Sequence, residues 1–421
     1  MQMLRLLVTG ASGYIGRRFC EVAAERGCEV IVLGPAPSTG KFSHAFAWRL
    51  GDEPRPEAFA GIAAVIHLAH SWASDAQNGA SSANVNLSGS ERLARVAFAN
   101  NVPRFVFAST TSARSQALNA YGRVKYALEE RLLAVPHAAG RMICARIGLV
   151  YGGPEEGLYG QLSKLVRFTP ILPMTGLDRK VQPIYIDEVV AALLSLAIDP
   201  LPRRDGVSAA TYVLAGPETI TFGNWLRMLR RAHTGKRILL LPIPLWMALF
   251  ACDLTRLLPF ISTVNRERVL GLASTEPMDA ALDLAALHLD IDPPMKRLNL
   301  LRSDRRRIIV EAIAMLAYVS GKQAPPRAAV ARLVRGIERQ DAQPLGLPRV
   351  VTKCPALLRA FEPLWPSVDH RLTQRLHLAV MVVESMREQF GGRSNIGSLF
   401  GQAALEAMAV PFRLLLGQRY T

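Results

Sequence analysis

Cysteines and long apolar runs are scarce in this sequence. The 421 residues include five scattered cysteines, and no two of them have the spacing typical of metal ligands. We therefore expect the cysteines to be small core residues in a reducing cytoplasm, and we expect no metal site. No uninterrupted apolar run reaches about 20 residues, so no membrane-spanning helix is predicted. The first residues lead into a strand pattern without a charged and then apolar leader, so we expect no signal peptide and a cytoplasmic protein.

Acidic residues are also few. Asp and Glu number 34 against 50 Lys and Arg, which gives a formal net charge of +16. Such a balance favours nucleic acid, an anionic membrane surface or an anionic small molecule as the partner. No nucleic-acid module is visible, so we expect an anionic small-molecule substrate and no nucleic acid. Peripheral contact with the inner face of a membrane stays open as a further use of the charge, and so does a homodimer.

The first seventeen residues predict a dinucleotide-binding turn. An apolar run over residues 4–8 is typical of a buried strand, and Gly10, Gly13 and Gly16 follow it at G-x-x-G-x-x-G spacing. Gly10 permits a tight turn, Gly13 permits close approach of a pyrophosphate, and Gly16 permits the helix to pack on the strand. The phosphates would lie at the helix N-terminus, where N–H groups and the helix dipole favour anions. A second strand follows at residues 29–33, so the strand-helix-strand context of the motif is complete.

Strand and helix patterns alternate over about the first 145 residues. The expected strands are Arg5–Thr9, Glu29–Leu33, Ala64–Leu68, Phe105–Ser109 and Met142–Arg146. The expected helices are Tyr14–Arg26, Ser88–Asn100 and Ala120–Ala134. This alternation predicts an α/β fold with a doubly wound parallel sheet, in which ligands lie beyond the carboxyl ends of the strands.

The end of the second strand does not distinguish NAD from NADP. An acidic residue there would bind the ribose hydroxyls, and an arginine would accept a 2′-phosphate. The strand instead ends Val32-Leu33-Gly34-Pro35. Arg17 and Lys41 are nearby cations, which favours tolerance of NADP, but Arg17 is interpreted equally well as a solvated helix residue. We therefore expect the cofactor to be NAD or NADP.

Tyr121 and Lys125 form the predicted catalytic pair. Their spacing of four places both side chains on one face of a helix, one turn apart. A phenol titrates near pKa ~10, and a neighbouring ammonium lowers that pKa and favours proton transfer. Thr110, eleven residues upstream at the end of the fourth strand, offers a hydroxyl that would hold a substrate oxygen against the tyrosine. The pair would move a proton while hydride passes to or from a nicotinamide.

Eight motifs, all in the expected order, make the chain similar to the extended short-chain dehydrogenase/reductases, the NAD-dependent epimerase/dehydratase group. They are Thr9-Gly10-Ala11-Ser12-Gly13-Tyr14-Ile15-Gly16, Gly51-Asp52, Val65-Ile66-His67-Leu68-Ala69, Asn86-Leu87-Ser88-Gly89-Ser90, Phe105-Val106-Phe107-Ala108-Ser109-Thr110, Tyr121 with Lys125, Arg146-Ile147-Gly148-Leu149-Val150-Tyr151-Gly152, and Gln182-Pro183-Ile184-Tyr185-Ile186-Asp187-Glu188-Val189. The resemblance covers about residues 1–290 and implies a Rossmann fold with a smaller substrate lobe.

The resemblance also implies roles for individual residues. Thr110, Tyr121 and Lys125 would be catalytic, and Lys125 would also bond the nicotinamide ribose. Asp52 would contact adenine. The full set of cofactor-binding residues implied in this way is Gly10, Ser12, Gly13, Tyr14, Ile15, Gly16, Asp52, Leu68, Ala69, Tyr121 and Lys125.

The chain departs from the family pattern at two places, and these departures limit the reactions that we expect. Sugar 4,6-dehydratases have an Asp-Glu pair after the catalytic threonine, where this chain has Thr111-Ser112. The acid/base pair for eliminating water is therefore missing, and we do not expect a dehydratase. The short segment between Thr110 and Tyr121 resembles the atypical branch, which includes an accessory subunit of respiratory complex I. Some members of that branch bind nucleotide without known turnover.

Weaker signals have plainer interpretations. His67 and His70 lie three apart, but a strand end would splay them and no third ligand is near, so they predict no metal site. Asn86 is either a helix N-cap or, by the resemblance, a residue that stabilises structure near the active site. Asp187 and Glu188 are expected to open a helix, where acidic residues are favoured.

The chain is expected to comprise three regions. Residues 1–165 would bind NAD(P), residues 166–298 would form the substrate lobe with some segments returning to the Rossmann body, and residues 299–421 would form a helical extension of unknown role. A basic helix is expected to begin at Arg302–Arg307 and to continue as the apolar stretch Ile308–Val319. Further helices are expected at about Arg327–Arg339, Leu372–Phe390 and Ser398–Leu416.

The predicted substrate lobe holds two further features. Arg167, Arg179 and Lys180 are candidate partners for a phosphorylated substrate, although each is also typical of a solvated surface charge. Residues 238–261 are strongly apolar and predict a core helix, with a face lying in a membrane interface as the alternative.

Together these features predict an NAD(P)-dependent oxidoreductase acting on a sugar nucleotide or a lipid-linked sugar. In an epimerase, NAD⁺ would take hydride from the carbon whose hydroxyl proton Tyr121 removes, and would return it to the other face. An NADPH-dependent ketone reductase would use the same residues. The alternative from another class is a nucleotide-binding assembly subunit.

Overall fold

The computed structural model describes residues 3–36, 41–81, 83–200, 203–204, 207–208, 210–255, 266–273, 276–321, 324–340, 344–358 and 366–386. The chain divides into two compact units. The first comprises Met1–Gly152 and Glu156–Leu298, and the second comprises Gly153–Glu155 and Asn299–Thr421.

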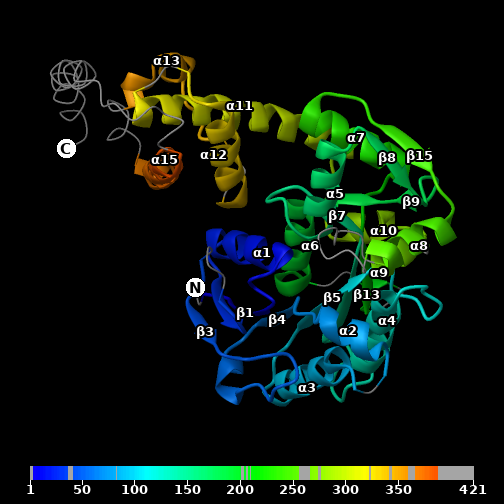
Figure 1. The fold of residues 1–421 in the computed structure, drawn as a ribbon. Coiled ribbons are helices and arrows are strands. Elements are labelled where there is room, and N and C mark those ends of the chain that lie inside the picture. Colours follow the sequence, from blue (N-terminus) through cyan, green and yellow to red (C-terminus); the bar gives the residue numbers. More distant parts are fainter. Residues whose placement is uncertain are drawn as a thin grey trace, which may run out of the picture. The chain divides into compact units, whose positions relative to one another are not determined.

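A seven-stranded parallel sheet is the centre of the first unit (Figure 1), with the strand order β13-β6-β5-β4-β1-β2-β3. Its strands are β1 (Arg5–Thr9), β2 (Glu29–Leu33), β3 (His44–Phe46), β4 (Ala64–His67), β5 (Phe105–Thr110), β6 (Met142–Ile147) and β13 (Thr211–Leu214). The middle strands are apolar on both faces because helices cover both sides of the sheet. The chain leaves β1 toward one edge and resumes at β4 on the other side of β1, so the topological switch point lies between β1 and β4.

Helices cover the two faces of this sheet. On one face α1 (Tyr14–Glu25) and α6 (Ile186–Ile198) pack on Leu6, Val8 and their neighbours. On the other face α3 (Val85–Ala99) and α4 (Ala120–Leu133) pack on Leu7, Phe107 and their neighbours. Figure 1 shows α1 and α6 on one side of β1, β4 and β5, and α3 on the other.

The expected doubly wound α/β fold is thus confirmed, and the five expected strands agree with the structure to within one residue at each end. Two sheet strands were not predicted. β3 is only three residues long, with two of them exposed, and so has too little apolar pattern to be recognised. β13 comes from the region expected to form the substrate lobe and pairs with β6. Helix α6 has Asp187 and Glu188 in its first turn, as expected.

The remaining elements of the first unit are shorter. They are η1 (Pro56–Phe59), α2 (Trp72–Asn78), β7 (Leu149–Tyr151) paired with β10 (Pro183–Tyr185), α5 (Gly157–Phe168), β8 (Ile171–Met174) paired with β15 (Leu239–Pro242), β9 (Lys180–Val181) paired with β14 (Ile220–Thr221), β11 (Arg203–Arg204) paired with β12 (Val207–Ser208), α7 (Phe222–Thr234), α8 (Leu245–Thr255), α9 (Arg266–Ala273) and α10 (Ala281–Ala286).

The second unit is helical where it is described. Its elements are α11 (Pro294–Ser320), which begins in the first unit, α12 (Arg327–Gln340), α13 (Arg349–Lys353), η2 (Pro355–Leu357) and α15 (Pro366–Ser385). Ala312, Leu333 and Leu372 belong to its buried core. The helix expected over residues 398–416 lies outside the described residues. Among the helices that are described, none is both long enough and apolar enough to cross a membrane.

The cysteines are free thiols. Cys20, Cys144 and Cys252 are buried and Cys28 is partly buried, as expected for small core residues. Cys354 is exposed, so for this residue the expectation was wrong. It is the C-cap of the short helix α13 in the second unit.

Candidate functional site

The glycine turn connects β1 to α1 in very little space. Gly10 has φ +70°, and a Cβ placed on it would lie 2.7 Å from the backbone of Leu68 and Ala69 after β4. A Cβ on Gly16 would overlap Gly10 O and lie 2.8 Å from Ala11 Cα. Gly13 is the N-cap of α1, and a Cβ there would meet only Gly10 O, at 3.2 Å. Gly10 and Gly16 are therefore required by packing, whereas Gly13 keeps open the space in front of the helix N-terminus.

Three further residues that the sequence analysis singled out, Tyr14, Arg17 and Asp52, each have a defined contact. The Tyr14 hydroxyl donates a hydrogen bond to Gly152 O, and burial raises the pKa of Tyr14 well above its ordinary value. Arg17 forms an ion pair with Glu156 and is only 21% exposed, so it is neither a solvated residue nor an uncommitted cation. Asp52 is exposed, and its carboxylate accepts a hydrogen bond from Arg49 N at 3.1 Å.

Thr110 closes β5 at the carboxyl edge of the sheet. Its Oγ1 accepts a hydrogen bond from Ser112 N at 3.2 Å. A hydroxyl that accepts in this way still has its own hydrogen to donate. The neighbouring Ser109 hydroxyl points to Glu129, whose carboxylate also binds the guanidinium of Arg146 on β6. Ser109 is therefore tied to the interior of the fold, whereas Thr110 lies at the carboxyl end of β5.

Lys125 anchors the second turn of α4 to β5. Its Nζ donates a hydrogen bond to Ala108 O at 2.7 Å and lies 4.5 Å from the centre of the Phe107 ring. The side chain is buried, and this burial lowers the pKa of Lys125 to about 8 against the opposing effect of Asp75 and Glu129. An ammonium has three hydrogens, so two donors remain after the bond to Ala108.

The start of α4 is fixed from a distant part of the chain. Glu267 in α9 accepts a hydrogen bond from Ala120 N at 2.6 Å, although the two residues are 147 positions apart. A Cβ on Gly122 would lie 2.5 Å from Ser112 O and 2.8 Å from Asn119 Oδ1. The segment between Thr110 and α4 is therefore packed closely against the helix that carries Tyr121.

Tyr121 lies in an aromatic cluster with Trp72 and His70. The Tyr121 and Trp72 rings are stacked with their centres 4.6 Å apart and an interplanar angle of 24°. The His70 ring meets both rings edge-on, at 5.1 Å from each. The Nε2 of His70 is 2.7 Å from Asp75 Oδ2, and its buried Nδ1 has no hydrogen-bond partner among the described residues. Burial, followed by Lys125, lowers the pKa of His70. The neutral imidazole therefore has one hydrogen-bonding position still unused beside the tyrosine.

One carboxylate organises the loop behind this cluster. Burial alone would raise the pKa of Asp75, but hydrogen bonds from His70, Asn84 and Asn86 hold it below the ordinary value. Asn86 also bonds both the N–H and the C=O of Ser71, at 2.7 Å and 2.9 Å. Asn84, not Asn86, is the N-cap of α3, so the N-cap interpretation of Asn86 was wrong by two residues. Asn86 instead fixes the loop that leads into Trp72.

The structure reverses the expected pKa shift of Tyr121. Burial, followed by the negative charge of Asp75, raises the pKa of Tyr121 well above its ordinary value. Lys125 lies 5.8 Å from the centre of the tyrosine ring, and its hydrogen bond goes to Ala108. The phenol is therefore protonated in the resting protein.

His67 and His70 occupy separate environments. His67 is fully buried, with Nδ1 2.7 Å from Thr9 Oγ1 and Nε2 2.8 Å from Ser90 Oγ. Burial lowers the pKa of His67 to about 3, so the ring is neutral and links β1, β4 and α3. The two histidines do not converge on a common point.

The predicted substrate cations lie apart from this cluster. Arg167 is 3.3 Å from His233 Nδ1, and Arg179 and Lys180 are exposed. Sequence reasoning did not identify Trp72, Asp75 or Glu267 as site residues. The only signal for the cluster in the sequence was a tryptophan three residues after the predicted motif that ends at Ala69. Nothing in the sequence connects Glu267 to Ala120.

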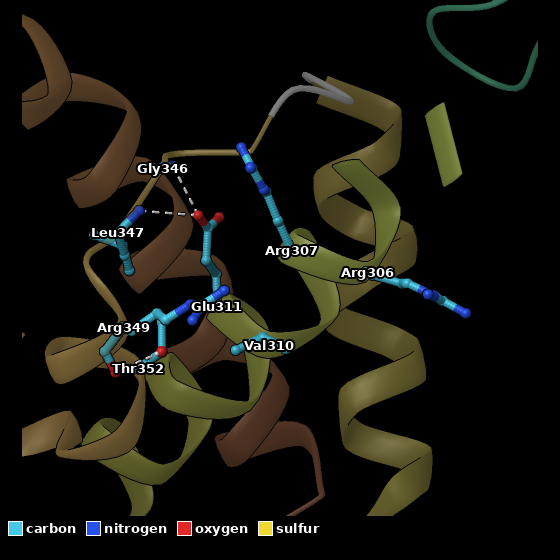
Figure 2. Close-up of a pocket in the computed structure, with 8 residues that line it drawn as sticks. All are labelled: Arg306, Arg307, Val310, Glu311, Gly346, Leu347, Arg349 and Thr352. Carbon is cyan, nitrogen blue, oxygen red and sulfur yellow. Dashed lines mark hydrogen bonds between the residues drawn. The ribbon is translucent and has the colours of Figure 1, made fainter. Parts of the chain in front are cut away.

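A cavity of about 420 Å³ lies within the second unit (Figure 2), lined by Arg306, Arg307, Val310, Glu311, Gly346, Leu347, Arg349 and Thr352. Glu311 already accepts hydrogen bonds from the N–H groups of residues 345–347. Figure 2 shows the Arg306 side chain directed away from Glu311. The acidic group in this cavity therefore serves the adjacent loop.

Comparison with known proteins finds similarity over about half of the chain. Residues 6–204 match the model of the NAD dependent epimerase/dehydratase family. The chain is 23% identical over 261 residues to a 2-alkyl-3-oxoalkanoate reductase of Stenotrophomonas maltophilia, with 56% of this chain and 77% of that protein covered. It is 24% identical over 235 residues to subunit 9 of the NADH dehydrogenase 1 alpha subcomplex of Dictyostelium discoideum, with 53% of this chain and 62% of the subunit covered.

A solved structure supports the fold. The UDP-glucose 4-epimerase of Thermotoga maritima with UDP-glucose superposes with a TM-score of 0.52 at 19% identity, covering 71% of this chain and 98% of the epimerase. The family's description as NAD dependent agrees with the expected dinucleotide cofactor. The glycine turn, the strand that ends at Thr110 and the Tyr121–Lys125 pair all lie within residues 6–204, the part of this chain that is similar to the NAD dependent epimerase/dehydratase family.

Proposed function

We propose that the chain transfers hydride between NAD(P) and a carbon that bears a hydroxyl or ketone oxygen, in a sugar nucleotide or a lipid-linked sugar. The observation that supports this most is the arrangement of Thr110, Tyr121 and Lys125 at the carboxyl edge of β5. β5 is next to β4, which borders the switch point, and the backbone after β4 is in close contact with the glycine turn.

The residues of the turn fit a dinucleotide. Gly13 leaves the N-terminus of α1 open, and Gly10 lets the turn pack closely against the backbone of Leu68 and Ala69 after β4. Ser12, Tyr14, Ile15 and Gly16 would complete the phosphate side, and Asp52 would contact adenine. The two remaining donors of Lys125 suit ribose hydroxyls. The cofactor, when bound, supplies or accepts the hydride.

The protein's own groups would manage the proton. The Thr110 hydroxyl donates a hydrogen bond to the substrate oxygen and holds it at the Tyr121 phenol. Tyr121 gives its proton to that oxygen in reduction and takes it back in oxidation. Lys125 fixes the helix that carries Tyr121 to β5 and supplies positive charge near the phenol.

Reduction of a ketone is the second candidate reaction. Reduction starts from the protonated form of Tyr121, since the phenol donates its proton to the oxygen of the ketone while hydride reaches the carbon. The reductase relative from Stenotrophomonas maltophilia is in agreement with this direction. A non-catalytic assembly role is the alternative from another class, in view of the Dictyostelium discoideum relative.

The first test is to identify the nucleotide released when the purified protein is denatured, by mass spectrometry. Retained NAD⁺ supports an epimerase, since an epimerase regenerates its cofactor in each cycle. An empty protein that binds NADPH supports the reductase, and a protein that binds neither overturns the proposal. Tyr121→Phe separates catalysis from assembly, because it abolishes the turnover of an enzyme and leaves an assembly role untouched. Tyr126→Phe on the same helix is the matched control and keeps full turnover.

A further inference from the structure

The two-stranded ribbon of β8 and β15 is apolar on the side that faces water. The strands are parallel, with Ile171 opposite Leu239 and Leu172 opposite Leu240. Leu172 and Leu240 are buried, whereas Ile171 is 52% and Leu239 56% exposed. A solvent-facing side of a strand is ordinarily polar. Here both strands carry aliphatic side chains on it, and Leu241 continues the row.

Helix α8 extends this surface. It begins three residues after β15, and Ile243 N between them donates a hydrogen bond to Met174 O of β8 at 3.2 Å. One side of α8 packs on α9 through Ala248 and Cys252. Trp246 and Phe250, four positions apart and on one helix face, are 67% and 65% exposed.

A third contribution comes from the end of α5. Phe168, three residues before β8 begins, is 73% exposed. We refer to these exposed side chains together as the apolar face, defined by Phe168, Ile171, Leu239, Leu241, Trp246 and Phe250. Large exposed apolar surfaces of this kind mark sites of association.

The charge of the segments that form the apolar face is mainly positive. Residues 164–174 and 236–255 contain four cations, Lys164, Arg167, Lys236 and Arg237, against one acidic residue, Asp253 in α8. Lys164 is exposed and precedes Phe168 by one helical turn, and Lys236 and Arg237 are exposed directly before β15. The rim therefore attracts anions while the centre excludes water.

We propose that the apolar face docks on the surface of an anionic lipid bilayer. Trp246 and Phe250 would enter the boundary between headgroups and acyl chains, and the rim cations would contact lipid phosphates. α8 has 11 residues, so it is too short to cross and would lie in the interface. A second copy of this chain is the poorer occupant, because a two-fold interface would bring together two sets of four cations with only Asp253 of each copy to balance them.

Vesicle sedimentation of the full chain tests this inference without substrate or cofactor, so its outcome is independent of the proposed reaction. We expect binding to phosphatidylcholine vesicles that contain phosphatidylglycerol, and weaker binding to phosphatidylcholine alone. W246S/F250S should lower the partition coefficient about tenfold or more. K236S/R237S should weaken binding to anionic vesicles only, and added salt should remove the difference between this variant and the wild type.

Leu282→Ser is the matched control, because Leu282 is an exposed leucine (70%) of α10 outside the apolar face. It should bind vesicles like the wild type. Brominated lipids should quench the wild-type fluorescence more than that of Trp246→Phe, which reports insertion even if the double serine variant folds poorly. Equal quenching in the two proteins, or no binding to anionic vesicles, overturns the proposal. So does a dimer in light scattering that W246S/F250S dissociates, since the face would then belong to a second copy.

Discussion

The same added methyl group should lower stability at Gly16 and weaken cofactor binding at Gly13. Both lie in the turn before or within α1, and neither has a positive φ, so alanine is tolerated by the backbone at each. They differ in what a Cβ would meet. At Gly16 it would overlap Gly10 O and reach Ala11 Cα at 2.8 Å, whereas at Gly13 the nearest atom is Gly10 O at 3.2 Å.

The magnitudes follow from these distances. Overpacking costs about 1–3 kcal/mol, and the atoms around Gly16 are backbone that cannot rotate away, so the upper part of that range applies. Alanine returns about 1 kcal/mol of helix propensity. Gly16→Ala should therefore lower the free energy of unfolding by about 2 kcal/mol. Gly13→Ala should change it by less than about 1 kcal/mol, because the poorer N-cap is offset by the reduced freedom of the unfolded chain.

Cofactor binding should be weakened by Gly13→Ala, the variant with the smaller effect on stability. A methyl group on Gly13 would stand in front of the helix N-terminus and push a phosphate away from an N–H donor. Losing one charge-assisted hydrogen bond costs about 1.5–3 kcal/mol, so Gly13→Ala should bind NAD(P) about 10- to 100-fold more weakly.

The assays are chemical denaturation for stability and calorimetric titration with NAD and NADP for affinity. Gly336→Ala in α12 is the control, since its Cβ would meet nothing closer than Leu378 Cδ1 at 3.9 Å. It should leave cofactor binding unchanged. Equal destabilisation by Gly13→Ala and Gly16→Ala, or full affinity in Gly13→Ala, would refute the division of roles.

Three further perturbations test other parts of the structure. The pKa of Lys125 is lowered to about 8 in the folded protein, whereas its unfolded value is about 10.4. Between these pH values the unfolded chain binds a proton that the folded chain lacks, so the free energy of unfolding should rise with pH. Lys125→Met should remove this rise, and an unchanged pH slope would contradict the burial argument. His70→Ala should lower kcat about tenfold by loosening the Tyr121 ring while the affinity for NAD(P) stays constant, and an unaltered kcat would exclude a positioning role. Glu311→Ala should destabilise the second unit by about 3–5 kcal/mol, because Arg375 is equally buried beside it; a denaturation midpoint equal to that of the wild type would show that the pair is not stabilising.

The sheet was predictable because its signals are local. Each of the five expected strands is a short apolar run with a turn behind it, and burial on both faces makes that run nearly continuous. β13 escaped prediction because it is separated from its partner β6 by more than sixty residues. Nothing in the local pattern of Thr211–Leu214 says which edge it joins.

The candidate site was predictable only along one helix and one strand. Tyr121 and Lys125 follow from helical spacing, and Thr110 follows from the strand before them. The direction of the pKa shift of Tyr121 was wrong, because sequence spacing showed the nearby lysine but neither the burial of the ring nor the charge of Asp75. Trp72 stacks on Tyr121 through tertiary packing, which no local pattern encodes.

The division of the chain into a cofactor region, a substrate lobe and an extension stays a prediction at the boundary of residue 165. The compact first unit extends to Leu298, with Gly153–Glu155 assigned to the second. Contacts such as β13 with β6 show why a boundary within this unit is not readily drawn from composition.

The hydrogen bond from Ala120 N to Glu267 has a consequence for dissecting the protein. The residues that match the family end at 204, yet the helix that carries Tyr121 is capped from residue 267, and β6 is covered by a strand at residues 211–214. A fragment cut at residue 204 would leave β6 as a bare sheet edge and α4 with an unsatisfied first turn. Residues 6–204 therefore match the family but do not contain all the contacts that fold them. A truncated or transplanted version would keep the sequence motifs and lose the contacts that hold α4 and β6 in place.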